Sequence, residues 1–282
     1  MNGRRTMERY QSADARLAFR ETGAGMPVVF LHPTPLDHDY WRPLIEGLGG
    51  IRAIVPDLRG HGQSELGSDL PVGGFTRVPD APVVTMAQLA ADVLALLDHL
   101  GIPEAVFAGC SIGGYVLLEL WRQAQKRMRG LVFICSKPQP DAEANLARRA
   151  AIIAQIRATG TSGVFDEMAR GLVGPTAQQR CPELGSEVRA RMTLMPQAAI
   201  AVQAGLATRP DSVPTVATID GPLLAVAGGE DPAIAPAEME AFHTAPGGCE
   251  YHLLPDAGHL AAYEQPAKVA SLLAVWLRQL EP

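Results

Sequence analysis

The sequence predicts an α/β fold with a central parallel β-sheet that helices cover on both faces. Short apolar runs alternate along the chain with amphipathic, helix-like runs, an order that is typical of a parallel sheet. The short runs are almost uniformly apolar, whereas strands with one face in water alternate between apolar and polar residues. Both observations indicate strands that are buried between two layers of helices.

Six runs are the expected strands of this sheet. They lie at residues 28–31, 53–55, 105–108, 131–135, 223–227 and 251–254. Because each run is short and apolar on both sides, the sheet is expected to form the centre of the molecule.

The best-marked helix lies between the second and third of these strands. Thr85 and Gln88 form a capping-box pair at its start, and Gly101 marks its end. One apolar stripe runs along it, made of Leu89, Val93, Leu96, Leu97 and Leu100. A second helix is expected directly after Ser111, and a last one over residues 267–280. All three should pack on the sheet.

Two segments interrupt the alternation of strands and helices. Residues 67–84 are rich in Gly, Pro and Asp and are expected to form a surface loop. Residues 141–209 contain only helical patterns, and we interpret them as a small helical lid over the sheet. No internal repeat or low-complexity tract marks a second domain. We therefore expect a single domain over residues 1–282, with the lid as an insertion at about 141–209.

The charge balance excludes an electrostatic footprint for nucleic acid. The chain has 24 Lys and Arg against 30 Asp and Glu, a formal net charge of −6. No apolar run approaches the roughly 18 residues of a membrane-spanning helix, and residues 1–10 lack the apolar core of a signal peptide. We expect a cytoplasmic protein without nucleic-acid or membrane partners. Whether it forms a homodimer stays open.

No group of residues has the spacing of a metal site. The four cysteines lie far apart and are expected to be reduced thiols that pack as small apolar residues. The densest cluster of candidate ligands comprises His32, Asp37, His38 and Asp39. It lacks a second upstream histidine, which weakens the comparison with metal-dependent lactonases. We predict no metal.

Residues 109–114, GCSIGG, join an expected strand to an expected helix, the context in which a serine becomes a nucleophile. The tight turn would push the side chain of Ser111 out of the sheet, and Gly109 and Gly113 would let strand and helix approach closely. A serine between glycines is by itself more often an ordinary turn. Ser111 is therefore a candidate nucleophile whose partners must come from elsewhere in the chain.

A serine nucleophile needs a histidine base that an acid holds in the right tautomer. Asp231 follows the fifth expected strand and His259 follows the sixth, so the chain order is Ser, Asp, His. Glu230, next to Asp231, is a rival acid. The loop after the fourth expected strand, an alternative place for the acid, begins with Ser-Lys. We predict Ser111, Asp231 and His259 as a catalytic triad.

Five motifs, in the same order along the chain, resemble landmarks of the α/β-hydrolase superfamily. They are LHP at 31–33, DLRGHGQS at 57–64, GCSIGG at 109–114, GGED at 228–231 and AGH at 257–259. The resemblance implies a mostly parallel sheet of about eight strands, helices on both faces and a small helical lid. The lid and the LDH stretch at 36–38 are similar, more narrowly, to the group of 3-oxoadipate enol-lactonases, small carboxylesterases and cofactor-free haloperoxidases.

The resemblance also implies an oxyanion hole, in which two backbone N–H groups stabilise the charge that forms when the serine attacks. Ile112 would supply one donor and Thr34 the other. Pro33 replaces the glycine that is usual in the family, and neither Pro33 nor Pro35 has an N–H. Only Thr34 can therefore donate from this segment.

These features predict a hydrolase for a small-molecule ester or lactone that works through an acyl-enzyme and needs no cofactor. The arginines of the lid include Arg148, Arg149, Arg170 and Arg189. An acidic substrate would need one of them to face the pocket. Other readings stay open: carbon–carbon bond hydrolysis, haloperoxidase or perhydrolase chemistry, or a non-catalytic ligand receptor on the same scaffold.

Overall fold

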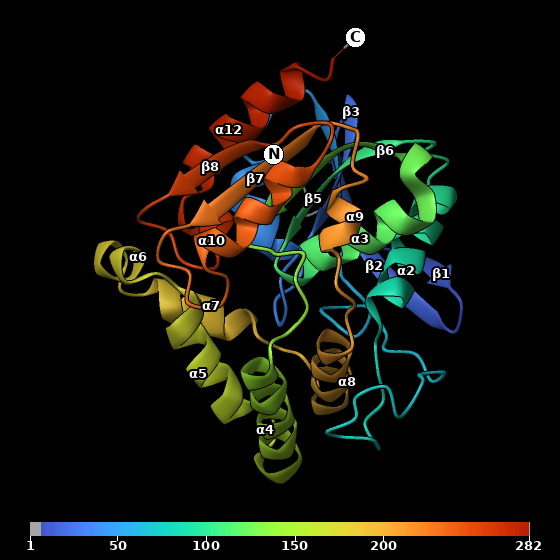
Figure 1. Ribbon diagram of the computed structural model, residues 1–282, viewed down its shortest axis with the longest axis vertical. Helices are drawn as coiled ribbons and strands as arrows, with labels where there is room; N and C mark the ends of the chain where they lie inside the picture. The colour runs from blue at the N-terminus through green and yellow to red at the C-terminus, as the bar shows by residue number, and fades with distance from the viewer. Residues whose placement is uncertain (1–6, 282) are drawn as a thin grey trace.

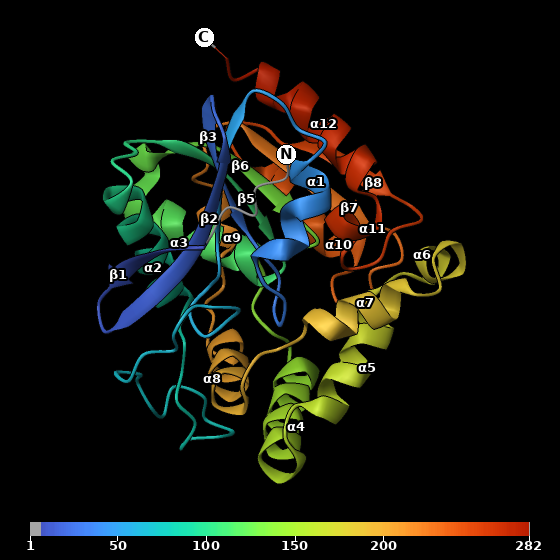
Figure 2. The same ribbon diagram turned by 180° about the vertical axis from the view of Figure 1, so that it is seen from behind.

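The computed structural model describes residues 7–281 and contains an eight-stranded sheet. The strand order is β1-β2-β4-β3-β5-β6-β7-β8. Strands β3 to β8 pair in parallel, while β2 runs antiparallel to both β1 and β4. Figures 1 and 2 show the sheet in the middle of the molecule, with helices in front of it and behind it. The predicted α/β class with a mostly parallel sheet is confirmed.

Six of these strands are the predicted ones, with ends within three residues of the prediction. They are β3 (Met26–Leu31), β4 (Ile51–Pro56), β5 (Ala105–Cys110), β6 (Met128–Ile134), β7 (Leu223–Gly228) and β8 (Glu250–Leu254). The apolar runs did not reveal β1 (Glu8–Ser12) and β2 (Ala15–Gly23). Both expose part of their residues, so no uniform apolar run marks them.

Two apolar clusters, one on each face of the sheet, form most of the core. Alternate residues of one strand belong to different clusters: Val29 and Leu31 of β3 to the first, Val28 and Phe30 to the second. The first cluster includes buried residues of α2 (Met86–His99) and α3 (Ile112–Ala124), and the second those of α1 (Arg42–Ile45) and α12 (Pro266–Arg278). Helices therefore cover both faces, which explains the uniformly apolar strands.

The helix α2 begins where the sequence predicts. The hydroxyl oxygen of Thr85 accepts a hydrogen bond from the backbone N–H of Gln88 at 3.0 Å. A capping box also requires the Gln88 side chain to accept the backbone N–H of Thr85. This part of the prediction is wrong, because the Gln88 Oε1 atom is buried without a partner among the described residues. The helix thus relies on one side-chain cap at its first turn.

Between β6 and β7 the chain forms only helices, as predicted, and we refer to residues 143–207 as the lid segment. Its helices are α4 (Glu143–Thr159), α5 (Ser162–Leu172), α6 (Pro175–Arg180), α7 (Leu184–Arg191) and α8 (Pro196–Ala207). Figure 1 shows α4, α5 and α8 at one end of the molecule and α12 at the other. The remaining short elements are η1 (His38–Trp41), η2 (Gln125–Arg127), α9 (Val213–Val216), α10 (Pro236–Met239), η3 (Glu240–Thr244) and α11 (Ala261–Glu264). Over residues 7–281, no helix is both long and apolar enough to cross a bilayer.

Residues 67–84 form the predicted loop, but part of it is buried. Phe75 and Val78 belong to a third apolar cluster, together with Ile153 of α4 and Ala204 of α8. The loop therefore packs against the lid segment instead of lying free on the surface.

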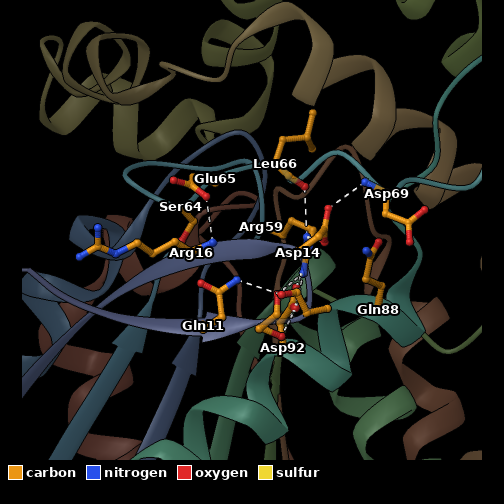
Figure 3. Close-up of polar contacts among 12 residues, drawn as sticks. Gln11, Asp14, Arg16, Arg59, Ser64, Glu65, Leu66, Asp69, Gln88 and Asp92 are labelled. Atoms are coloured by element: carbon orange, nitrogen blue, oxygen red, sulfur yellow. Dashed lines mark hydrogen bonds and ion pairs between the residues drawn. The ribbon is translucent and has the colours of Figure 1, made fainter.

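A buried ion-pair network joins the turn between β1 and β2 to α2 (Figure 3). Arg59, which is fully buried, donates from Nε and Nη2 to the carboxylate of Asp92 at 2.8 and 2.7 Å and from Nη1 to Asp14 at 2.9 Å. The hydroxyl of Ser12 donates to the same Asp92 carboxylate at 2.6 Å. This paired geometry compensates the loss of hydration that burial imposes on the charges.

Candidate active site

Ser111 occupies the sharp turn between β5 and α3. Its backbone φ and ψ are 52° and −116°, a conformation that non-glycine residues rarely adopt and that often accompanies function. Close glycine packing accommodates the turn. A Cβ on Gly109 would lie 2.4 Å from the carbonyl carbon of Gly113, and one on Gly113 would lie 2.2 Å from the carbonyl oxygen of Leu31. Neither position can carry a side chain without moving the backbone.

His259 lies after β8 and Asp231 after β7, and the structure brings their side chains together. His259 Nδ1 is 2.8 Å from Asp231 Oδ2, and both side chains are buried. The other carboxylate oxygen of Asp231, Oδ1, accepts the backbone N–H groups of Ala233 and Ile234 at 2.8 and 3.0 Å. With Nδ1–H bound to this fixed carboxylate, Nε2 of His259 is left as the proton acceptor.

Asp231 also raises the basicity of His259. Burial by itself disfavours the charged imidazolium and lowers a histidine pKa. The negative charge of Asp231 and its hydrogen bond outweigh burial here, and Glu264 adds to them, so the pKa of His259 is raised above its ordinary value. The imidazole is therefore a stronger base than an isolated histidine.

A cavity of about 280 Å³ is bordered by three of the predicted site residues, Ser111, His259 and Thr34. Asp231 does not border the cavity; its carboxylate contacts His259, which does. The lid segment supplies apolar lining residues, among them Ile152, Met168, Leu172 and Leu206. Of the lid segment's other methionines, Met192 is buried, whereas Met195 is 66% exposed. The cavity thus lies between the sheet and the lid segment.

Two backbone N–H groups at this site have no acceptor within the described part of the chain. Among residues 7–281, neither the N–H of Thr34 nor that of Ile112 donates a hydrogen bond to another protein group. Ile112 opens α3, where the first N–H groups have no intrahelical acceptor. The two prolines beside Thr34 have no N–H at all. Both donors are therefore available to an oxygen atom of a bound molecule.

The side chain of Thr34 is fixed by His61. His61 Nδ1 lies 3.1 Å from the carbonyl oxygen of Arg59, and its Nε2 lies 2.9 Å from Thr34 Oγ1. Since a carbonyl oxygen only accepts, Nδ1 carries the proton. Burial lowers the pKa of His61 to about 4, so the ring is neutral at pH 7. The Thr34 hydroxyl therefore donates to Nε2, which orients residue 34 at the cavity wall.

The loop that carries His259 is tied to the end of α5. The N–H of His259 donates to the carbonyl oxygen of Leu172 at 2.9 Å. The Glu264 carboxylate accepts the N–H groups of both Gly174 and Gly258, at 3.1 and 2.8 Å. This part of the lid segment and the loop of His259 are therefore joined by one backbone hydrogen bond and by the Glu264 carboxylate, which binds an N–H group of each.

The rival residues that the sequence suggests have other partners. Glu230 accepts hydrogen bonds from the N–H and the hydroxyl of Thr176 in the lid segment. His38 Nδ1 lies 2.8 Å from Asp57 Oδ1, and His32 Nε2 accepts a backbone N–H at 2.9 Å. Among the described residues, no group of three or more His, Cys, Asp or Glu side chains is arranged to hold a metal ion. These side chains serve contacts within the protein.

Several charged residues of the cavity were not assigned to it from the sequence. Lys137, Asp141 and Glu167 line the cavity, and so do Arg148 and Arg149, two of the four lid arginines singled out from the sequence. One signal was present: residues three and four apart lie on one face of a helix, and this spacing relates Asn145, Arg148, Arg149 and Ile152. The sequence did not reveal that this face of α4 is the one turned to the cavity.

Comparison with known proteins gives a consistent result. The model of a family described as the Alpha/beta hydrolase family matches residues 28–272. A curated relative, 3-oxoadipate enol-lactonase 1 of Acinetobacter baylyi, is 24% identical over 257 residues, which cover 90% of this chain and 89% of the relative. A thermophilic esterase from Thermogutta terrifontis, solved with malate bound, is 31% identical with a TM-score of 0.88, covering 99% of this chain and all of its own. The enol-lactonase from Burkholderia xenovorans LB400, 22% identical with a TM-score of 0.83 over 96% of this chain and all of its own, shares the fold.

Proposed function

Because the chain belongs to the alpha/beta hydrolase family, we propose that it is a serine hydrolase that cleaves a carboxylic ester or lactone through an acyl-enzyme. The observation that carries this proposal is the arrangement at the cavity. Ser111 sits on a strained turn, His259 borders the same space, and Asp231 is bound to His259 from behind. A nucleophile, a base and an orienting acid are the parts that acyl transfer requires.

In the first step, Ser111 Oγ attacks the carbonyl carbon of the substrate while His259 Nε2 takes the hydroxyl proton. The imidazolium that forms is stabilised by Asp231, and it then gives its proton to the leaving alkoxide. In a lactone the leaving alkoxide stays attached to the acyl group. Water, activated by the same Nε2 atom, then attacks the acyl-enzyme and releases Ser111.

The N–H groups of Thr34 and Ile112 are proposed as the oxyanion hole. Both lack an acceptor within the described protein, and donors fixed in advance stabilise charge that develops during the reaction. The hydrogen bond from Thr34 to His61 would keep this segment in place. Losing one such donor typically lowers kcat by about 100-fold or more.

The comparisons support an ester or lactone as substrate. The 31% identical relative over nearly the whole chain is an esterase, and the curated relative over 90% of it is an enol-lactonase. We propose that the lid segment covers the bound substrate and excludes bulk water, since it lines the cavity opposite the sheet. The proposed reaction uses protein groups and water and requires no cofactor.

Hydrolysis of a graded set of 4-nitrophenyl esters and small lactones by the wild type and by Ser111→Ala tests the proposal. We expect the wild type to turn over and the variant to lose about 10⁴-fold or more of kcat. Ser271→Ala, an exposed serine on α12, is the matched control and should retain full activity. Unimpaired activity in Ser111→Ala would exclude the serine mechanism. If the folded wild type cleaves no ester or lactone, carbon–carbon bond hydrolysis or a non-catalytic receptor becomes the better explanation.

A further inference from the structure

One wall of the cavity, near the start of α4, contains more buried positive than negative charge. Asp141 lies between two arginines, with its side chain only 2% exposed. Arg209 Nη2 donates to Asp141 Oδ1 at 2.7 Å, and Arg149 Nε donates to Asp141 Oδ2. Burial would raise the pKa of Asp141, but the two guanidinium groups outweigh it and lower that pKa, so the carboxylate is ionised. Two positive charges share one negative charge.

The surroundings of this cluster add no second negative charge. Arg149 Nη1 donates to the neutral amide oxygen of Gln203 at 2.9 Å. The guanidinium of Arg209 lies 4.1 Å from the ring centroid of Tyr115, a contact that stabilises a cation without neutralising it. Arg209 Nε is buried without a hydrogen-bond partner among the described residues. The cluster therefore keeps one unit of positive charge beside the cavity.

The other charges of the cavity wall do not cancel this excess. Lys137 is matched by Glu238, to which its ammonium group donates. Arg148, one residue before Arg149 on α4, also lines the cavity and is in no ion pair within residues 7–281. Glu167, on α5, is an exposed negative charge of the cavity wall that forms no ion pair with any described residue. Arg148 and Glu167 thus offset each other in sign, and the buried excess at Arg149 remains.

We propose that this wall is a subsite for a carboxylate of the substrate, so that the preferred substrates are esters or lactones that carry a second, ionised carboxyl group. This inference rests on the proposed serine hydrolase function of the same cavity. A guanidinium presents parallel N–H donors that match the two oxygens of a carboxylate. Nη2 of Arg149 makes no hydrogen bond within the described protein, so this group has a donor to offer. Arg148 would complete the contact from the rim.

The test compares matched substrates that differ only at the far end of the acyl chain. One series consists of 4-nitrophenyl monoesters of linear dicarboxylic acids with four to eight carbons, and the other of their terminal carboxamides. The carboxamide has the size of the carboxylate but no charge. Spontaneous hydrolysis is subtracted for each compound. For at least one chain length, kcat/KM should favour the carboxylate about tenfold or more.

Variants on the lid segment locate the effect. Arg148→Met should reduce the preference for the carboxylate several-fold, and Glu167→Gln should increase it, because it removes a like charge from the rim. Arg170→Met, an exposed arginine of α5 that does not line the cavity, should leave the preference unchanged. Arg149→Lys keeps the charge that Asp141 needs but loses the guanidinium fork, so it should reduce the preference while the protein stays folded.

The outcomes separate this inference from the proposed function. If the wild type hydrolyses carboxamides as fast as carboxylates at every chain length, the carboxylate subsite is excluded while ester hydrolysis stands. If a preference exists but Arg148→Met and Arg149→Lys leave it unchanged, the subsite lies elsewhere and the inference is overturned. If no compound of either series is cleaved, the proposed function itself fails.

Discussion

At the level of single residues, the contact between His259 and Asp231 determines both which ring nitrogen of the histidine carries the proton and the pKa of the ring. The hydrogen bond fixes the ring nitrogen that carries the proton, and the charge of the carboxylate raises the pKa of His259. A histidine that is already protonated cannot take the proton of Ser111. Activity should therefore increase with pH as His259 loses its proton, with a midpoint above 6.5, the ordinary value for histidine.

The variant Asp231→Asn tests this coupling. Loss of the negative charge removes the main cause of the raised pKa, so the acidic limb of kcat/KM should shift to lower pH. The maximal rate should fall by about 10³- to 10⁴-fold, since an amide does not hold the required tautomer. The measurement is kcat/KM on a neutral 4-nitrophenyl ester between pH 5 and 9.

Glu230→Gln is the matched control for that experiment, because Glu230 is the adjacent acid and binds Thr176 instead of His259. Its pH profile should coincide with that of the wild type. If the acidic limb shifts in Glu230→Gln and not in Asp231→Asn, Glu230 is the acid that orients His259 and our assignment of that role to Asp231 is wrong.

The sequence could identify residues that belong to local motifs and could not identify those that reach the cavity from distant elements. Ser111 is marked by the glycines around it, and His259 by its place after the last strand. Arg149 carries no such mark, because its neighbour Gln203 approaches only when α4 and α8 pack together. Tyr115 and Lys137 line the cavity for a similar reason: the packing of whole elements places them there.

At the level of elements, Arg59 links three separate parts of the fold by ion pairs. It follows β4, Asp92 lies on α2, and Asp14 lies in the turn between β1 and β2. Because Arg59 is fully buried and Asp92 nearly so, removing only the arginine would leave a buried carboxylate without its counter-ion.

Arg59→Met should therefore lower the free energy of unfolding by about 3–5 kcal/mol, as measured by urea denaturation. The same change at Arg52, whose ion pair with Glu21 is partly exposed, should cost about 1 kcal/mol or less. The double variant Arg59→Met/Asp92→Asn should recover part of the loss, because the unpaired charge is gone. Equal losses at Arg59 and Arg52 would contradict this account.

Strands and helices could be predicted from the sequence where burial produces a simple pattern of apolar residues. The six central strands are uniformly apolar, so their existence follows from the sequence, whereas their ends depend on pairing with neighbours. The strand β1 shows both exposed and buried residues and resembles a surface segment. The Gln88 side chain was predicted to complete a capping box, but its oxygen is buried without a partner. Composition did predict a loop at 67–84, although not its packing on α4.

At the level of the whole molecule, two neighbouring histidines are buried in neutral form. Burial lowers the pKa of His32 to about 3 and that of His61 to about 4. Below pH 6.5 the unfolded chain takes up protons at both positions and the folded chain does not, so folding is disfavoured. His38 and His259 have raised pKa values and act in the opposite direction, but their gain is essentially complete once the pH has fallen below 6.5.

The free energy of unfolding should therefore fall between pH 7 and pH 5. Each of the two neutral histidines should contribute about 2 kcal/mol to the loss at pH 5. Urea denaturation at a series of pH values measures the slope. His61→Gln, which cannot titrate, should reduce the slope by about half, while His243→Gln, at an exposed position on η3, should leave it unchanged. A His61→Gln curve parallel to that of the wild type would show that His61 does not stay neutral in the folded protein.

The backbone joint between the end of α5 and the loop of His259 bears on how this molecule can be re-engineered. Leu172 accepts the N–H of His259, and Glu264 binds Gly174 and Gly258 together. A chimaera in which residues 143–207 are exchanged as one segment would therefore also replace Leu172 and Gly174, which hold the loop of His259 in place. Exchange of residues 143–159 alone would avoid this joint and still change the polar face of α4. To change substrate choice without disturbing proton transfer, the exchanged segment must therefore end before α5.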